Sequence, residues 1–228
     1  MRDPAGLPPG FIYLGRAMKR SLEWIGAGLL LGASLQTQAA VDVRAAIASG
    51  YGEIEAPGLD AKVEDFVGGD FRARFQANEH VFLRGQYLTM SGNDFRANGQ
   101  DYDIDTDLDV LRLGVGYGSN WNSIRLYAAA EYVDLELGIE GEDDNADGLG
   151  ATVGISDQGN GSWFWNAELS ALILDDLRGA SLDASVGYRF TPTVAGLIGV
   201  QSYSLEDKDD SDYEFGFGQV YAGFQLSF

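Results

Sequence analysis

The chain has 228 residues, no cysteine and a formal net charge of −20. The absence of cysteine excludes a disulfide framework and a thiolate metal site. The acidic balance disfavours nucleic acid as a partner, because lysine and arginine are needed to neutralise phosphates.

Residues 1–39 have the features of a secretory signal peptide. Met18 to Arg20 is a short basic start, Trp24 to Leu35 is an apolar run, and Thr37 to Ala39 are small or polar residues suited to cleavage after Ala39 or Ala40. We expect Met18 to be the true start. The apolar run is shorter than the roughly 20 residues of a spanning helix, and no other run approaches that length. Any membrane crossing must therefore use strands.

Residues 40–228 are predicted to form a single all-β domain. Apolar and polar residues alternate with period two, which is typical of strands with different surroundings on their two faces. We expect about ten strands, with eight as the alternative. The expected strands are Val41 to Glu55, Val63 to Ala77, His80 to Met90, Asp107 to Gly118, Ser123 to Leu137, Gly148 to Ser156, Ser162 to Leu174, Ala180 to Phe190, Val194 to Leu205 and Tyr213 to Phe228.

The connections between these strands are expected to alternate in length. The short turns are Asn78-Glu79, Asn120 to Asn122, Gly159 to Gly161 and Thr191 to Thr193, and the longer connections are Pro57 to Lys62, Gly92 to Thr106, Gly138 to Asp147 and Glu206 to Asp212. One connection of the second set, Asp175 to Gly179, is short. Transmembrane barrels place short turns at one end and long loops at the other. An even number of strands then leaves both termini at the short-turn end.

The last strand continues to the final residue. Val220, Ala222, Phe224 and Leu226 form one apolar face, and the opposite face is mostly polar. A chain end frays unless it is held by a partner. A closed barrel supplies one, because its last strand pairs with its first and no edge is left open.

The residues Tyr221-x-Gly223-x-x-Leu226-x-Phe228 resemble the C-terminal assembly signal of bacterial outer-membrane barrels. The chain as a whole resembles the small barrels typified by OmpX and the OmpA membrane domain, although those have eight strands. The resemblance implies a closed, antiparallel, up-and-down transmembrane β-barrel in the outer membrane, with both termini in the periplasm. It also implies contact with outer-membrane lipid and lipopolysaccharide, and recognition by the barrel-assembly machinery. An ordinary last strand of a soluble sandwich is the alternative.

Charged residues occur in mid-strand on the polar faces and are predicted to point into the lumen of such a barrel. They are Arg72, Arg74, Arg84, Arg112, Arg125, Glu131, Glu168, Asp183 and Arg189. About eight to ten strands leave an interior that side chains roughly fill. Unpaired buried charges are costly, so the arginines should pair with Asp70, Glu131, Glu168 and Asp183. This predicts a crosslinked polar plug; a narrow wet channel is the alternative.

Acidic runs fall in the expected long connections. They cover Asp101 to Asp109, Glu140 to Asp144 and Glu206 to Asp212. Carboxylates in such runs are ligands for Ca²⁺ or Mg²⁺, and the weak candidates here are Asp143, Asp144, Asp209 and Asp210. The spacing of an EF-hand is missing, so a solvated loop surface is the favoured interpretation. Bridging of divalent cations to lipopolysaccharide phosphates is the functional alternative, and we expect no cofactor.

The sequence gives little support for an enzyme. Outer-membrane barrel enzymes use a histidine near the extracellular or lipid-exposed surface, whereas the single histidine here, His80, lies beside a short turn. No second group is placed to form a nucleophile–base pair with it. Two functions remain: a structural or surface-interaction barrel with acidic loops, and a small porin-like channel for ions or small polar solutes.

Overall fold

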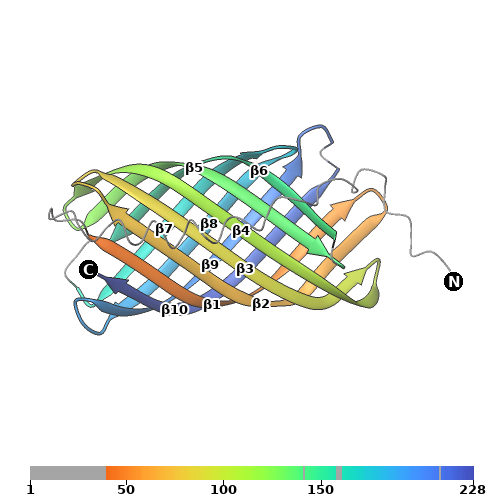
Figure 1. Cartoon of the computed structure of the whole chain (residues 1–228), viewed down its shortest axis with the longest axis horizontal. Coiled ribbons are helices and arrows are strands. Elements are labelled where there is room, and N and C mark those ends of the chain that lie inside the picture. Colours follow the sequence, from red (N-terminus) through yellow and green to blue (C-terminus); the bar gives the residue numbers. More distant parts are fainter. Residues whose placement is uncertain (1–39, 141, 158–160, 211) are drawn as a thin grey trace.

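The computed structural model describes residues 40–140, 142–157, 161–210 and 212–228, so the expected signal peptide lies outside the described residues. Ten antiparallel strands form one closed barrel (Figure 1). The strands are β1 Val41–Ala56, β2 Leu59–Gln76, β3 Val81–Ala97, β4 Gln100–Trp121, β5 Ile124–Ile139, β6 Glu142–Asp157, β7 Trp163–Leu174, β8 Leu177–Arg189, β9 Val194–Asp207 and β10 Glu214–Ser227. The expected up-and-down barrel is confirmed with ten strands, and the eight-stranded alternative is wrong. Within these residues, no helix is long and apolar enough to cross a membrane.

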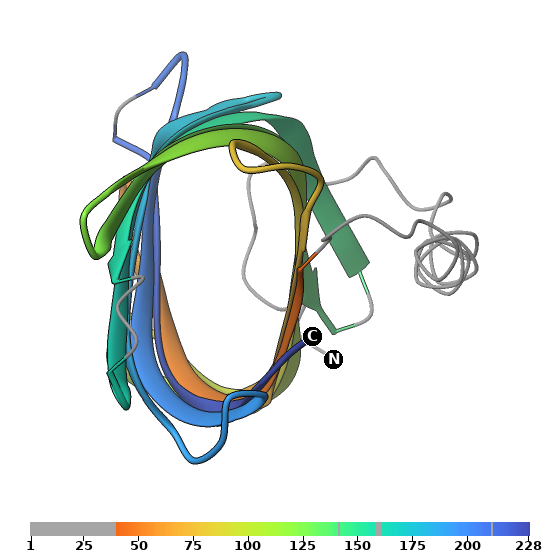
Figure 2. The same ribbon diagram turned by 90° about the vertical axis from the view of Figure 1, so that its left-hand side faces the viewer.

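The barrel closes between β1 and β10, down to the last residue. The amide of Val41 donates to the carbonyl of Phe228 (3.1 Å), and the amide of Phe228 donates to the carbonyl of Val41 (2.9 Å). Viewed along its axis, the barrel has an oval outline (Figure 2). We call the end that carries Val41 and Phe228 the terminal end, and the opposite end the distal end.

The strands extend further toward the distal end than the sequence indicated, which corrects the expected loops. A turn at Pro57 and Gly58 joins β1 to β2, and a turn at Asn98 and Gly99 joins β3 to β4. Asn98 and Gly99 both have positive φ (51° and 77°), as in the two-residue turns that match strand twist. β5 and β6 are likewise separated by only two residues. Of the four long connections, only the one between β9 and β10 remains longer, and its described residues are 208–210 and 212–213.

The inside and the outside of the barrel exchange polarity along its axis, and β4 shows this clearly. Near the terminal end, Val115 is exposed on the outer face, while Arg112 is buried on the inner face. Farther along the same strand, Asp105 and Asp107 are exposed, while Leu108 is buried. The outer wall is therefore apolar in the terminal half and acidic in the distal half, and the inner wall follows the opposite pattern.

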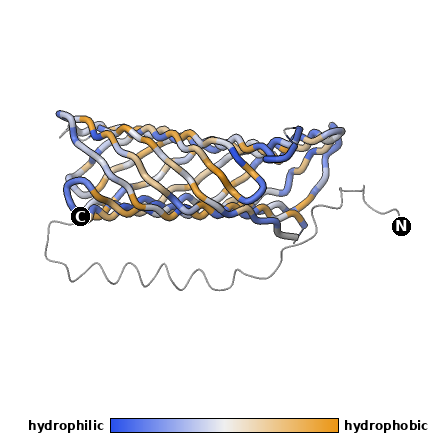
Figure 3. The backbone as a smooth tube through the Cα atoms, turned by 90° about the horizontal axis from the view of Figure 1, so that it is seen from above, coloured by the Kyte–Doolittle hydropathy of each residue, from blue (hydrophilic) through white to orange (hydrophobic). Residues whose placement is uncertain are grey.

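We call the exposed apolar side chains of the terminal half the apolar belt. It includes Ile47, Val67, Phe71, Leu83, Leu113, Val115, Tyr117, Leu126, Leu149, Val153, Trp163, Leu169, Leu182, Val186, Ile198, Val200, Val220, Phe224 and Leu226. Apolar surface exposed on this scale is a membrane or partner surface in a stable protein. The alternation of hydrophilic and hydrophobic residues along the chain is visible in Figure 3.

We call the buried apolar side chains inside the distal half the lumen core. It includes Val63, Phe66, Leu88, Met90, Leu108, Val110, Val133, Leu135, Leu172, Leu174, Leu205 and Phe217. Each large side chain buried away from water contributes about 1.5–3 kcal/mol. The distal half is thus stabilised in the manner of a water-soluble barrel.

Strand irregularities lie at the transition between the two halves. Val63 and Phe66 are both buried, although an odd spacing of three residues would place them on opposite faces of a regular strand. A bulge at Asp65, which has a φ of 62°, supplies the extra residue that returns Phe66 to the inside. The same bulge shifts the register of β1 against β2: Gly50 pairs with Phe66, whereas Gly52 pairs with Val63.

Candidate functional site

The lumen of the terminal half contains a layer of ion pairs between opposite walls. The guanidinium of Arg72 on β2 lies 2.6 Å from Asp70 and 2.8 Å from Asp183 on β8. That of Arg84 on β3 lies 2.9 Å from Glu131 and 2.7 Å from Glu168 on β7. We call these residues together with Arg112 the ion-pair layer. Because β2 and β3 face β7 and β8 across the barrel, the side chains span the lumen.

Arg112 is the most fully coordinated member of this layer. It pairs with Glu131, and it donates hydrogen bonds to Thr152 (3.0 Å), Ser170 (2.7 Å) and Ser181 (3.2 Å). The carboxylate of Glu131 is completely buried between Arg84 and Arg112. Charges removed from water are tolerated when opposite charges and hydrogen bonds surround them, and this arrangement meets that condition.

Neutral residues of the polar strand faces, which are not part of the predicted charge network, complete the layer. The hydroxyl of Tyr127 donates to Glu168 (2.5 Å), and the amide of Gln219 donates to Gln201 (2.7 Å). Gln86 also donates to Gln201 (3.0 Å). Alternation along the strand could have predicted their inward direction. Each of them lies an even number of residues from an inward charge or polar group on its own strand.

The remaining three predicted arginines lie nearer the terminal end and make different contacts. The guanidinium carbon of Arg74 lies 3.8 Å from the centre of the Phe82 ring, and that of Arg125 lies 5.6 Å from it. Arg189 lies over the ring of Phe164 and donates to the carbonyl of Gly161 (2.6 Å). The structure does not bring Arg74 or Arg125 within ion-pair distance of a described carboxylate.

The four residues of the predicted assembly signal divide between the two faces of β10. Leu226 and Phe228 are exposed on the outer face. Tyr221 is buried and donates from its hydroxyl to Asp183 (3.0 Å). Gly223 faces β1 so closely that an added Cβ would lie 2.1 Å from the carbonyl oxygen of Ala45.

The candidate cation ligands are not gathered into a site among the described side chains. No group of three or more acidic or histidine side chains in that part of the chain has the geometry to hold a metal ion. Asp209 and Asp210 lie in the β9–β10 loop, where both amides donate to Asp207. Asp144 is an exposed residue of β6, and the side chain of Asp143 lies outside what the structure describes.

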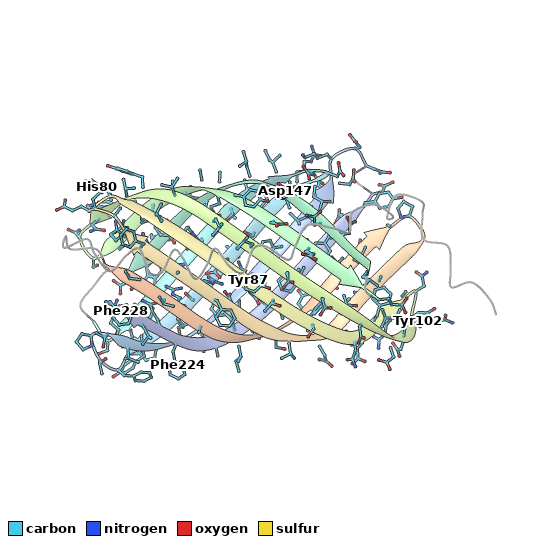
Figure 4. The ribbon with its side chains drawn as sticks, viewed as in Figure 1. His80, Tyr87, Tyr102, Asp147, Phe224 and Phe228 are labelled. Carbon is cyan, nitrogen blue, oxygen red and sulfur yellow. The ribbon has the colours of Figure 1, made fainter. Side chains whose placement is uncertain are left out.

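His80 lies at the terminal end, the end that also carries Phe228, and far from Tyr102 at the distal end (Figure 4). Its ring stacks on Tyr117 with a centroid distance of 5.2 Å, and its Nδ1 lies 3.1 Å from the carbonyl oxygen of Gly118. These two contacts hold the His80 ring in place beside the turn between β2 and β3.

Two acidic residues of the outer distal wall face each other directly. Asp134 on β5 pairs in register with Asp147 on β6, and one carboxylate oxygen of Asp134 is buried without a hydrogen bond. Partial burial, and secondarily the charge of Asp147, raise the pKa of Asp134 above its usual value. A carboxyl group whose pKa is raised by folding destabilises the folded state once it is ionised.

Asp134→Asn is therefore expected to stabilise the protein at neutral pH, by up to about 1 kcal/mol, because like charges directly opposite each other repel. The gain should be complete above the raised pKa and should shrink as the pH falls toward the ordinary carboxyl pKa of about 4. Guanidinium unfolding of the refolded protein in detergent, at neutral and acidic pH, measures it. Asp209→Asn, which makes the same charge change in an exposed loop, is the control. An equal gain in stability in both variants, or a gain that does not change with pH, would show that the ionised Asp134 carboxylate is not the cause.

Comparison with known proteins places this geometry in a family. Curated protein sequences give no match. Among solved structures, the outer membrane protease OmpT from Escherichia coli is similar at 11% identity, with a TM-score of 0.53, and covers 86% of this chain and 99% of its own. Neisserial surface protein A is 14% identical, with a TM-score of 0.44 and coverage of 83% and 99%. OprG from Pseudomonas aeruginosa is 12% identical, with a TM-score of 0.43 and coverage of 83% and 95%.

These likenesses concern the fold alone. The sequence itself matches the family described as "Outer membrane protein beta-barrel domain" over residues 25–190. That match covers the first eight strands, β1 to β8, and it agrees with the closed barrel and its apolar belt. The chain belongs to the family of outer-membrane β-barrel proteins.

Proposed function

We propose that the protein is a sealed outer-membrane barrel that acts as a structural or surface-interaction element and does not conduct solutes. The observation that carries this proposal is the succession of two closed layers in the lumen. The ion-pair layer crosses the barrel between opposite walls, and the lumen core follows it directly. In the β2–β3 register, Arg72 lies opposite Gln86, Asp70 opposite Leu88, and Gly68 opposite Met90.

A conducting pathway would have to pass both layers. Leu88 and Val110 are completely buried inside the distal half, and the rings of Phe66 and Phe217 meet edge to face at a centroid distance of 6.4 Å. A polar solute would lose its hydration against these side chains without gaining hydrogen bonds in return. The small-channel alternative requires both layers to open.

The outer distal wall is the surface offered for interaction. With the apolar belt in the membrane and both termini in the periplasm, this wall stands outside the cell and presents exposed carboxylates on the strands. These include Glu55, Asp60, Glu64, Asp94, Asp101, Asp103, Asp105, Asp107 and Glu214. Divalent cations that bridge such carboxylates to lipopolysaccharide phosphates would fit this charge pattern. In the periplasm, Tyr221, Gly223, Leu226 and Phe228 would serve the barrel-assembly machinery. We propose no enzymatic activity, since the one histidine is engaged in contacts at the terminal end.

The purified protein, reconstituted in a planar bilayer, is expected to give no steady unitary current. Insertion must be checked on the same sample by the shift between unheated and boiled protein on an SDS gel, because folded barrels resist SDS until they are heated. Steady, reproducible unitary currents from correctly folded protein would overturn the sealed-barrel proposal in favour of the channel.

A further inference from the structure

A cavity of about 190 Å³ opens in the lumen at the terminal end, beneath the ion-pair layer. Five arginines line it, namely Arg44, Arg72, Arg74, Arg84 and Arg189. Such a concentration of cations is unexpected in a chain with a net charge of −20.

The strand register brings these arginines together in like-charge pairs. Arg44 lies directly opposite Arg72 in the β1–β2 ladder, and Arg74 lies directly opposite Arg84 in the β2–β3 ladder. Like charges in directly opposed positions destabilise a sheet. Arg72 and Arg84 are paired with carboxylates of the ion-pair layer. Arg44 donates to the neutral amide oxygen of Gln225 (2.8 Å). Arg74 lies directly opposite Asp42 in the β1–β2 ladder but makes no ion pair with a described carboxylate.

Arg74 is held by aromatic rings and not by an ion pair with a described carboxylate. Its guanidinium lies on the ring of Phe82 and 5.1 Å from the centre of the Tyr127 ring, and its buried Nη2 has no hydrogen-bond partner. Arg125, which is only 6% exposed, lies over the same Phe82 ring with its Nε also buried and unpartnered. A guanidinium that stacks on a ring keeps its in-plane N–H donors available.

The Phe82 platform is itself fixed. A Cβ added to Gly116 on the neighbouring strand would lie 2.1 Å from the Phe82 ring, so the ring occupies space that only glycine leaves open. Three carboxylates also line the cavity, and each already has a partner. Glu168 accepts from Arg84 and Tyr127, Asp42 accepts from Ser227 at 2.5 Å, and Asp157 is likewise engaged.

The geometry points to a binding site for a small oxyanion of the phosphate class, held by Arg74 in the cavity wall. Arg125 does not line the cavity itself, but its guanidinium lies over the same Phe82 ring and supplies a second cation beside the site. Guanidinium forks match the oxygen spacing of phosphate, and the cavity volume admits a small group of this kind. The group could be free phosphate or the headgroup of an anionic lipid that reaches the barrel mouth. Such a site does not depend on whether the lumen conducts.

Calorimetric titration of the full-length mature protein, refolded in zwitterionic detergent, tests this site. Inorganic phosphate should bind and should raise the thermal unfolding temperature above that in chloride at matched ionic strength. In Arg74→Gln, phosphate affinity should fall at least about tenfold, because hydrogen bonds to a charged group are lost. The same variant should be as stable as wild type without phosphate, since it breaks no ion pair among the described residues. Its stability therefore separates binding from folding.

Arg178→Gln is the matched control, because Arg178 is an exposed residue paired with Glu206 in the distal half. It should leave phosphate binding unchanged. If Arg74→Gln does not refold, Arg125→Gln takes its place. A parallel titration with short-chain phosphatidylglycerol against phosphatidylcholine identifies the source: binding of the anionic lipid alone, lost in Arg74→Gln, assigns a headgroup site. Binding of neither ligand, or binding that survives in Arg74→Gln and Arg125→Gln, would overturn the inference.

Discussion

Replacing Val115 with arginine is expected to destabilise the folded barrel by about 2–4 kcal/mol, the cost of a cation at mid-depth on a lipid-facing wall. Val115 is half exposed in the middle of the outward apolar run of β4, between Leu113 and Tyr117. An arginine placed ten residues earlier, in Asp105→Arg, should change the free energy of unfolding by no more than about 0.5 kcal/mol, because the outer wall faces water at that position. Both positions point outward on one strand, so the contrast isolates the surroundings.

Reversible unfolding in guanidinium, with the protein refolded in phospholipid vesicles, measures both values. Val115→Ala, which shortens the side chain without adding charge, separates the cost of the cation from the loss of apolar contact. Similar effects of Val115→Arg and Asp105→Arg would show that the outer wall does not change its surroundings between these positions. A loss of stability in Asp105→Arg as large as that in Val115→Arg would place the distal half in the membrane as well.

The closed barrel could be predicted from the sequence because its evidence is local. The apolar face of β10 from Val220 to Leu226 continues to the end of the chain, and a strand in that position needs a partner. The structure supplies one in β1, from Asp42 opposite Ser227 to Glu55 opposite Glu214. The number of strands also follows from alternation with period two.

The distal half could not be predicted from the rule that holds in the terminal half, where apolar residues face outward and polar residues face the lumen. Outside the membrane, water surrounds the outer wall, so the acidic residues face outward and the apolar residues between them fill the lumen. In Asp105-Thr106-Asp107-Leu108-Asp109 this alternation is present, but the expected loop extends to Thr106 and the expected strand begins only at Asp107. The dipeptide Asn98-Gly99 is a strong signal for a two-residue hairpin turn and marks the true end of β3.

The partners of the inward arginines depend on the stagger of the closed barrel. Arg72 meets Asp183 across the lumen from a strand six places away in the sequence order, and no local pattern encodes that distance. The sequence indicates which charges point inward, and the barrel decides which of them meet.

Glu131→Gln is expected to have the largest effect of any single substitution in the lumen, about 3–5 kcal/mol, because it leaves buried cations without their carboxylate. Glu131 is shared by Arg84 and Arg112. Arg84 keeps Glu168 at 2.7 Å, whereas Arg112 would retain only neutral hydroxyl partners. Most of the lost stability should therefore come from the buried charge of Arg112, which no longer has a carboxylate partner.

A double-mutant cycle in the guanidinium assay isolates that loss. Adding Arg112→Gln to Glu131→Gln removes the stranded cation, so the double variant should be less destabilised than the sum of the two single variants. Glu206→Gln is the control, since it breaks the exposed pair with Arg178 and should cost at most about 1 kcal/mol. If Glu131→Gln costs no more than Glu206→Gln, water must reach Glu131. The ion-pair layer would then be a wet passage, which is the arrangement a channel requires.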